Sequence, residues 1–565
     1  MTVFVSLICS KTSDNQRFHD KHQAEYQIQL QEKSSPLDHQ RLTEFQINEH
    51  REERLKEIQM WSIIHKTLIY LLFLGLLYFV AYSNRSPHGF EQVHHLHRYF
   101  IHSRNENFNF LQINTIDKYW TWLEDIFLVK IRAQRWYNGH PPQYLSGFID
   151  DKNQRLIGWP TMRQIRIRST PCSTQKLETF CQDDYRLSNE EQRSFEPGWI
   201  NEAHGKANNS IERAFVYRSS EDLDSYWYIG DHATYSGNGF VYEFRGRLQE
   251  IKKNLSELHR HGWIDNQTRA VIIEMNFYNP NVHLLTSMVL LAECLSTGSV
   301  HSYIRVEPIQ FYDLTTVPQL ICWLVYFGWI IYFIVLEVRR LQQMKCKYFC
   351  RWWSYVEWLL ILFSWSLLGL FFWRYRETQR LGDLFRQSNG DVYINLQLST
   401  YINDLFTYLL AFCCFFATIR LFQLCEYHPQ LSLFGKTLRL AAPELISFSL
   451  MFSVIFIAFV SLFYLLFVSK IASCASLLRT AAMLFEMSLF KFDAGELTEA
   501  SAFLGPFCFG LFILLLVFIC LSVFLSIIND NFARARAMRD RKREEFFYWM
   551  WRRFSRWTGK ASSRI

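Results

Sequence analysis

Six long stretches without a charged side chain limit most strongly what this 565-residue chain can fold into. A helix that crosses a bilayer needs about 20 predominantly apolar residues. One such stretch could belong to the core of a soluble protein, but six together are typical of a membrane protein. The stretches are Thr67–Ser83, Leu314–Leu336, Trp358–Trp373, Leu405–Ile419, Leu445–Ser469 and Ala500–Asn529. The sequence therefore predicts six membrane spans.

Composition supports this prediction and excludes other classes of protein. Hydrophobic residues make up 49% of the chain and aromatic residues 17%, more than an ordinary soluble protein contains. The formal charge is only +7, and the basic residues gather near the spans rather than in a nucleic-acid-binding patch. The sequence has no Walker loop, no zinc-type spacing of Cys and His, and no G-x-S-x-G motif. We therefore expect neither an enzyme nor a nucleic-acid-binding protein, and no metal or other cofactor.

The positions of basic residues predict which side of the membrane each end of the chain occupies. The second span is followed by "EVRRLQQMKCK" and the sixth by "NFARARAMRDRKR", so both exits are expected in the cytoplasm. Residues 1–60 are polar and no cleavage site follows the first span, which therefore reads as a retained anchor with a cytoplasmic N-terminus. The long loop between the first two spans then faces outside. All four N-x-S/T sequons lie in this loop, and Asn84 is the weakest because a proline follows it. Glycosylation is expected at Asn208, Asn254 and Asn266.

The loop at residues 84–313 is long enough to form a domain with its own core. Strand-like runs such as "RQIRIRS", "GFVYEFRG" and "RAVIIEMNFYN" accompany a helical run at Leu248–His261, which predicts an α+β domain. Cys172 and Cys181 lie nine residues apart in this loop. In an oxidising compartment they are expected to form a disulfide, and the alternative is two free thiols.

Several motifs, taken in order along the chain, resemble polycystin-2-type channels. The last span resembles that family most closely at "FLSIINDNF", within Leu504–Phe532. The loop contributes four further motifs in the expected order and spacing, whereas the two terminal tails do not match. These motifs are "MRQIRIRSTPC" (Met162–Cys172), "ATYSGNGF" (Ala233–Phe240), "GWIDNQTRAVIIEMNFYNPNVHL" (Gly262–Leu284) and "STGSV" (Ser296–Val300).

The resemblance implies a six-span α-helical channel with a voltage-sensor-like bundle, a pore domain and an α+β polycystin domain. Such channels are homotetramers or heterotetramers of polycystin subunits, and the pore is formed by the fifth and sixth spans with a re-entrant helix between them. The implied organisation is a cytoplasmic segment (1–60), the first span (61–83), the polycystin domain (84–313), the second to fourth spans (314–440), the pore domain (441–530) and a basic aromatic tail (531–565).

The selectivity filter is where this chain departs from the family. The pore helix is expected at about Ser473–Leu489, followed in the family by Leu-Gly-Asp. Without a gap, the matching positions here are Leu489, Phe490 and Lys491. Four lysines around one axis would repel cations, whereas four carboxylates would attract them.

Four interpretations of Lys491 remain open. The ammonium could reach the acids of the expected outer mouth, Asp493 and Glu496. Fewer than four copies could be present, if a partner subunit carries an ordinary filter. The alignment could slip by two residues and place Phe492–Asp493 at the filter. Finally, the loop could belong to a subunit that does not conduct.

Two further positions concern gating. The resemblance places a lower gate at Leu525 and Asn529, although Leu525 could also be one of many leucines that face lipid or other helices. The fourth span carries Arg420, and the position three residues on is Gln423. Strong voltage dependence needs several basic residues at that spacing, so little is expected here.

The sequence suggests two local interactions outside the pore. Arg420 is expected to pair with an acid inside the bundle, such as Glu337 or Glu357. The tail beyond the sixth span has 11 Lys and Arg against three acids, interleaved with aromatic residues. This pattern suits anionic lipid headgroups or calmodulin, and the tail has neither an EF-hand loop nor a heptad repeat.

The function expected from these features is a divergent polycystin subunit that forms, or helps to form, a non-selective or calcium-permeable cation channel. Divergent invertebrate (brivido-like) relatives imply mechanical or thermal sensing in the plasma or ciliary membrane. The alternative is a non-conducting, receptor-like subunit that regulates another polycystin channel. Lys491 is the residue that separates these two hypotheses.

Overall fold

The computed structural model describes twelve parts of the chain, which form two compact units. One unit is Leu71–Ala417, and the other combines Met1–Tyr70 with Thr418–Ile565. Three predicted site residues, Asn208, Phe490 and Asp493, lie outside the described residues. The described ranges are 44–102, 109–133, 147–172, 180–200, 209–309, 317–350, 352–388, 391–425, 429–489, 491, 494–538 and 548–553.

A seven-stranded antiparallel sheet forms the centre of the first unit. Its order is β11-β10-β9-β2-β8-β5, with β1 paired to β9 beside this path. The three runs predicted as strands became β2, β8 and β9. The strands are β1 (Arg155–Leu156), β2 (Thr161–Arg166), β5 (Tyr217–Arg218), β8 (Gly239–Glu243), β9 (Thr268–Asn279), β10 (Leu284–Cys294) and β11 (Val300–Ile309). Two hairpins lie outside the sheet, β3 (Thr170–Pro171) with β4 (Phe180–Cys181), and β6 (Tyr228–Ile229) with β7 (Thr234–Tyr235).

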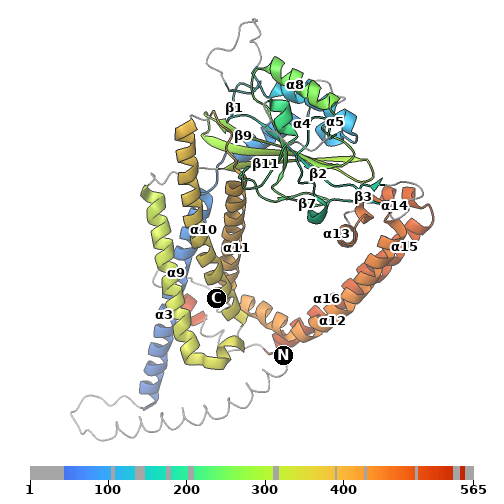
Figure 1. Ribbon diagram of the computed structural model, residues 1–565. Helices are drawn as coiled ribbons and strands as arrows, with labels where there is room; N and C mark the ends of the chain where they lie inside the picture. The colour runs from blue at the N-terminus through green and yellow to red at the C-terminus, as the bar shows by residue number, and fades with distance from the viewer. Residues whose placement is uncertain are drawn as a thin grey trace. The chain divides into compact units, whose positions relative to one another are not determined.

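Helices cover one face of the sheet and close the core of the domain (Figure 1). Apolar positions of α8 recur at Ile251, Leu255 and Leu258, so one face of that helix is buried against the sheet. Buried aromatic residues such as Trp122 and Trp263 fill the remaining volume. The elements on this side are α4 (Gly89–Ile101), η1 (Phe110–Gln112), α5 (Ile116–Trp122), η2 (Leu123–Phe127), α6 (Leu128–Lys130), α7 (Ser210–Ala214) and α8 (Leu248–Arg260).

Six described helices are long and apolar enough to cross a membrane, as predicted. Four of them are α3 (Glu44–Ser83), α9 (Val317–Met344), α10 (Trp352–Ser388) and α11 (Gln397–Cys425), with the 3₁₀ segment η4 (Lys345–Cys350) after α9. Aromatic rings join them. The Phe73 ring of α3 lies edge-on to Phe333 of α9, with ring centres 4.8 Å apart, and Trp323 of α9 contacts Phe371 of α10 at the same separation.

The second unit contains the last two long helices and a short helical segment between them. Its elements are α12 (Pro429–Phe467), η5 (Ala472–Cys474), α13 (Leu477–Ser488), α14 (Ala494–Ala500), α15 (Leu504–Phe512), the π-helical η6 (Ile513–Cys520) and α16 (Leu521–Ala537). The sixth span thus begins at Leu504 and not at Ala500, because α14 is a separate helix. The chain turns tightly between α14 and α15, since a Cβ at Gly505 would lie 2.1 Å from the Leu497 carbonyl oxygen.

Candidate functional site

The helix α13 begins with a capped N-terminus and ends at the predicted filter. The Ser476 side chain accepts a hydrogen bond from the Arg479 amide at 3.3 Å, which satisfies one of the free N–H groups of the first turn. Leu484 and Met487 are buried against α12 and the sixth span. The sequence expectation of a helix at Ser473–Leu489 is therefore shortened to Leu477–Ser488, because a 3₁₀ turn at Ala472–Cys474 precedes the cap.

Lys491 lies directly beyond the C-terminal end of α13. Its amide donates a hydrogen bond to the Glu486 carbonyl at 3.0 Å, which closes the last turn of the helix, and its side chain is exposed. The C-terminal end of a helix carries partial negative charge, so an ammonium group there is favoured electrostatically. A helix end of this kind attracts cations when no basic side chain neutralises it. The Lys491 ammonium group can therefore take the place of a cation that the helix dipole would otherwise attract.

The helix α14 supplies negative charge close to Lys491 in the sequence. Glu496 and Glu499 are both exposed on this short helix, whereas Leu497 is buried in the core shared with α12 and α15. Glu496 was expected at the outer mouth. Glu499 was not singled out, although its spacing of three residues from Glu496 places both on one helical face.

The sixth span contains a π-helical segment, Ile513–Cys520, between two α-helical parts. A π turn shifts the register of the residues that follow it, and such turns are frequent at functional sites. After this segment in the chain, Phe524 packs on Phe448 of α12 with ring centres 6.1 Å apart. Asn531, further along α16, is buried.

The predicted gate residues lie on a different face of α16. Leu525 and Asn529 are four residues apart and both are exposed, with Leu525 57% exposed. At 100° per residue they lie on the side of the helix turned away from α12. The two predicted gate residues therefore lie on an exposed face of α16.

A polar contact links α12 to the inner part of the sixth span. The Asn531 Nδ2 donates to Glu444 Oε2 at 2.7 Å and also to the Ile527 carbonyl at 2.9 Å. The Arg534 guanidinium reaches the other oxygen of Glu444 at 3.2 Å. Glu444 directly follows Pro443, the proline inside α12. The contact therefore joins the C-terminal part of the sixth span to the residue that follows the proline of the fifth span.

Arg420 lies in α11, and its guanidinium is centred 4.9 Å from the Tyr70 ring of α3. The acids proposed as its partners, Glu337 and Glu357, are both bound by Arg340. Tyr348 also donates to Glu337 at 2.8 Å. Arg340 therefore supplies a charge partner for both acids.

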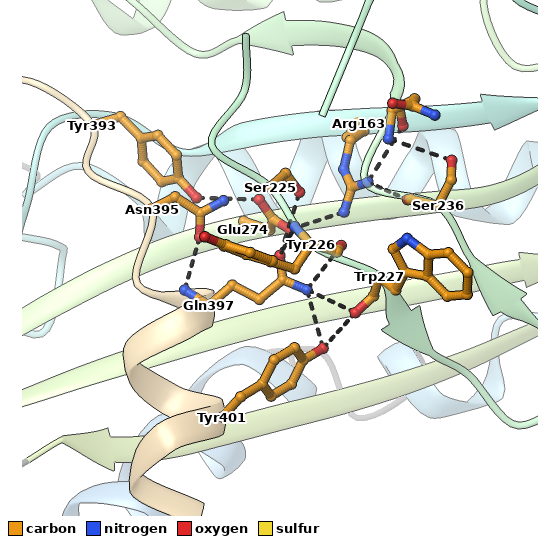
Figure 2. A network of polar contacts seen from close by, with 11 residues as sticks. Arg163, Ser225, Tyr226, Trp227, Ser236, Glu274, Tyr393, Asn395, Gln397 and Tyr401 are labelled. Carbon is orange, nitrogen blue, oxygen red and sulfur yellow. Dashed lines mark hydrogen bonds and ion pairs between the residues drawn. The ribbon is translucent and has the colours of Figure 1, made fainter. Parts of the chain in front are cut away.

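A buried polar network fastens the segment before α11 to the sheet (Figure 2). Arg163 of β2 is 2% exposed and forms an ion pair with Glu274 of β9 at 3.2 Å. Tyr393, between α10 and α11, donates to the second oxygen of Glu274 at 3.2 Å. Burial raises the pKa of the Tyr393 hydroxyl, so it stays a donor at physiological pH. Asn276 adds a hydrogen bond from its Nδ2 to the Ile394 carbonyl at 2.7 Å.

The first turn of α11 is fixed to the segment before β6 (Figure 2). The Gln397 side chain accepts from the Tyr226 amide at 2.9 Å and donates to the carbonyls of Tyr226 and Trp227, each at 3.1 Å. Tyr401 donates to the same Trp227 carbonyl at 2.8 Å. These hydrogen bonds attach the first turn of α11 to the α+β domain.

Gly158, just before β2, allows that segment to approach the backbone of Tyr393, between α10 and α11, very closely. Its φ is +66°, and a Cβ there would lie 2.3 Å from the Tyr393 backbone nitrogen. Because of the positive φ and this short contact, a residue with a side chain at position 158 would require a local shift of the backbone.

A third contact places three charged groups together at the edge strand β11. Arg305 binds Glu307 of the same strand and Asp404 of α11, the latter at 2.8 Å. Burial and the neighbouring Asp404 carboxylate raise the pKa of Glu307 to about 7, although Arg305 opposes the shift.

The remaining predictions concern covalent chemistry. Cys172 and Cys181 form the expected disulfide beside the β3–β4 hairpin, and the leftover Cys294 is a buried free thiol. Asn266 is exposed in a turn, and the Asn254 side chain on α8 contacts Ser210 Oγ at 3.3 Å.

The Glu444–Asn531 contact and the network around Arg163 and Gln397 were not predicted from the sequence. Glu444 was visible as a carboxylate at the start of an uncharged stretch, but its partner is 87 residues away. Both charged residues of β2, Arg163 and Arg166, are buried, and their spacing in the sequence does not indicate the separate partners, Glu274 and Asp265, that they bind.

Comparisons with known proteins agree with this architecture. Residues 109–312 match the polycystin domain, and residues 310–535 match the polycystin cation channel family. The chain is 26% identical to polycystin-2 of Danio rerio over 506 residues, covering 87% of this chain and 54% of that protein. It is 25% identical to human polycystin-2-like protein 1 over 496 residues (85% and 59%) and 26% identical to human polycystin-2-like protein 2 over 510 residues (87% and 78%). The chain thus spans little more than half the length of the first two relatives.

The fold defines a multi-pass membrane protein with six spans and an α+β domain between the first and second. A short helix, α13, lies in the chain between its last two spans. The chain belongs to the polycystin family, as a distant relative of polycystin-2-like proteins.

Proposed function

We propose that this chain is a subunit of a tetrameric polycystin cation channel with low preference for calcium. The observation that carries the proposal is the position of Lys491, at the C-terminal end of the helix between the last two spans. A lysine there neutralises the helix end and, repeated around an axis, disfavours divalent cations most. Glu496 and Glu499 on α14 retain a local attraction for monovalent cations. Leu525 and Asn529 are proposed as the inner gate, and Asp493 as a further acid of the outer mouth.

The test is the current carried by the full chain, expressed alone and with a polycystin-2-type partner. Reversal potentials with external sodium replaced by calcium give the relative permeability. We expect Lys491→Gln to raise relative calcium permeability several-fold, and Lys491→Asp with Phe490→Gly to raise it further. Lys470→Gln is the control, because Lys470 is exposed in the turn after the fifth span, outside the proposed filter. Unchanged selectivity in a conducting Lys491 variant would remove Lys491 from the permeation path.

The second candidate function is a non-conducting subunit that regulates another polycystin. Lys491 also favours this reading, because four ammonium groups at one constriction oppose all cations. Currents seen only with the partner, and altered in selectivity by Lys491→Gln, support a mixed tetramer. Absence of current from the chain alone at demonstrated surface expression supports the regulatory role.

The finer aspects of the proposal concern location and stimulus. We infer that both termini are cytoplasmic, that the polycystin domain is extracellular and that Asn208, Asn254 and Asn266 carry glycans. The basic aromatic tail is proposed to bind anionic lipid or calmodulin. A mechanical or thermal sensory role in the plasma or ciliary membrane follows from resemblance, and the attachment of the domain to α11 offers a route for such a stimulus. Peptide-N-glycosidase treatment with single Asn→Gln variants tests the orientation.

A further inference from the structure

Two exposed histidines from distant parts of the sequence lie side by side on the polycystin domain. His232 is at the tip of the β6–β7 hairpin and His301 is on the edge strand β11, and their ring centres are 5.0 Å apart. The Gly230 amide donates to the Ala233 carbonyl at 2.9 Å, which closes the turn that carries His232. Among the residues that the structure describes, neither imidazole has a hydrogen-bond or ion-pair partner.

The separation of the two rings suits a shared metal ion. Two imidazoles that bind one tetrahedral Zn²⁺ through nitrogen, at about 2.0–2.1 Å each, have ring centres roughly 5 Å apart. Both side chains are exposed, so each ring can turn a nitrogen towards one ion. Within the described ranges no three His, Cys, Asp or Glu side chains are placed to hold a metal together, so water completes the coordination of such an ion. Two imidazoles with water favour Cu²⁺ and Zn²⁺ over Ca²⁺ and Mg²⁺, which take oxygen ligands.

A buried carboxylate beside the histidine pair favours a cation there. Glu293 of β10 is 1% exposed and is the partner of His301 in the pairing of β10 with β11, so the two side chains project from the same face of the sheet. Its carboxylate accepts hydrogen bonds from the Tyr235 hydroxyl at 2.9 Å and from the amides of Asp231 and His232, each at 3.2 Å. No basic side chain of the described chain pairs with Glu293. A metal ion held by the histidines would supply the positive charge that this buried carboxylate lacks.

The hairpin approaches Glu293 closely because position 230 is glycine. A Cβ at Gly230 would overlap an oxygen of the Glu293 carboxylate. Together with the two amide hydrogen bonds, this contact fixes the turn, so His232 is held beside His301 before an ion binds. A preformed pair of ligands binds with a smaller loss of conformational entropy. The two histidines are far apart in the sequence, and chain spacing therefore gave no sign of the pair.

We propose that His232 and His301 bind one divalent transition-metal ion, Zn²⁺ or Cu²⁺, which cross-links the β6–β7 hairpin to β11. Both elements also contact α11, through the hydrogen bonds of Gln397 just before β6 (Figure 2) and the ion pair of Arg305 on β11 with Asp404. The bound ion therefore stabilises the part of the domain to which this helix is attached. The site belongs to the polycystin domain alone, so it does not depend on whether the channel conducts.

The test counts the zinc ions bound to each purified full chain in detergent, by equilibrium dialysis against ZnCl₂ with excess CaCl₂. We expect His232→Ala and His301→Ala each to bind one ion fewer than wild type. The double variant should lose no more than either single variant, because both residues hold the same ion. CuCl₂ should displace this ion, since imidazole sites bind Cu²⁺ more tightly than Zn²⁺. His261→Ala is the matched control, because His261 is an exposed histidine that follows α8, on the other face of the sheet.

Three outcomes would overturn the proposal. Wild-type zinc binding in either single variant would show that this histidine is not a ligand. A double variant that loses two ions would show two separate sites rather than a shared ion. Loss of one ion in His261→Ala as well would show that zinc binds exposed histidines without specificity. If His301→Ala melts below wild type in EDTA, His232→Ala still decides between these outcomes, because it changes only the tip of the hairpin.

Discussion

Asn531 of the sixth span donates a hydrogen bond to Glu444 of the fifth span at 2.7 Å, and Asn531 itself is 1% exposed. The bond lies where the inner parts of α12 and α16 pack together, and Arg534 binds the second oxygen of the same carboxylate. The face of α16 that bears Leu525 and Asn529 is turned away from this contact. The part of α16 that carries the proposed gate is therefore attached to α12 on the opposite face of the helix.

Removing the Asn531 contact should destabilise the pore unit and alter gating. A buried hydrogen bond to a charged group contributes about 1.5–3 kcal/mol, so Asn531→Ala should lower the melting temperature of the tetramer by several degrees. In a double-mutant cycle that combines Asn531→Ala with Glu444→Gln, the two substitutions should have non-additive effects on melting temperature and on open probability. Asp530→Asn, an exposed neighbour, is the control. Strictly additive effects would show that the contact carries no coupling.

Opening of the gate should depend on the hydrophobicity of position 525. Leu525→Asn should increase the resting current several-fold, because a polar ring keeps a narrow pore hydrated. Val523→Asn makes the same chemical change on a different face of α16 and should leave the resting current unchanged. Whole-cell recording at matched surface expression compares the two. Equal currents from both variants would place Leu525 outside the pore.

A side chain at position 158 should displace the backbone at Tyr393, and a second glycine with a similar φ allows this steric effect to be distinguished from backbone strain. Gly158→Ala places a methyl group against the backbone of the segment before α11 and strains a φ of +66°. Gly262→Ala strains a similar φ of +63° but meets no atom within 4 Å. Only the first should expose the residue 391–396 segment to limited proteolysis. Similar cleavage in both variants would attribute the effect to φ alone.

The raised pKa of Glu307 predicts that lowering the pH below about 7 stabilises the contact between β11 and α11. The pKa of Glu307 in the folded protein is about 7, above the ordinary value of 4.5, so the folded state binds the proton more tightly than the unfolded state. Stability from this group therefore rises as the pH falls from about 7 towards 4.5. Arg305, Asp404, Tyr228, Tyr303 and Tyr401 are the other titratable groups of this cluster.

The measurement is the melting temperature at pH 7.5 and 5.5 for wild type and Glu307→Gln. The variant should be more stable than wild type at pH 7.5, and its dependence on pH should be smaller by at least about 2 °C. Glu221→Gln, at an exposed position, should keep the wild-type dependence. An identical pH dependence in wild type and Glu307→Gln would remove Glu307 as the group responsible.

Much of the fold could be predicted from the sequence because its signals are local. The uncharged stretches identify the spans, since water-free surroundings exclude charge over a fixed length. The alternation in β2, β8 and β9 and the spacing of Cys172 and Cys181 are also local, and the structure confirms both. The boundary near Ala500 was wrong because an uncharged sequence does not show where one helix ends and a second begins.

The sequence by itself determined the six spans, the α+β domain, the disulfide and the unusual lysine at the proposed filter. Only the tertiary structure decided which polar groups meet. Glu444 with Asn531, Glu274 with Tyr393, and Gln397 with Tyr226 each combine residues far apart in the chain, and chain spacing carries no information about such pairs. The physical reason is that a polar group inside a fold is stable only with a partner, and the packing of helices and strands selects that partner.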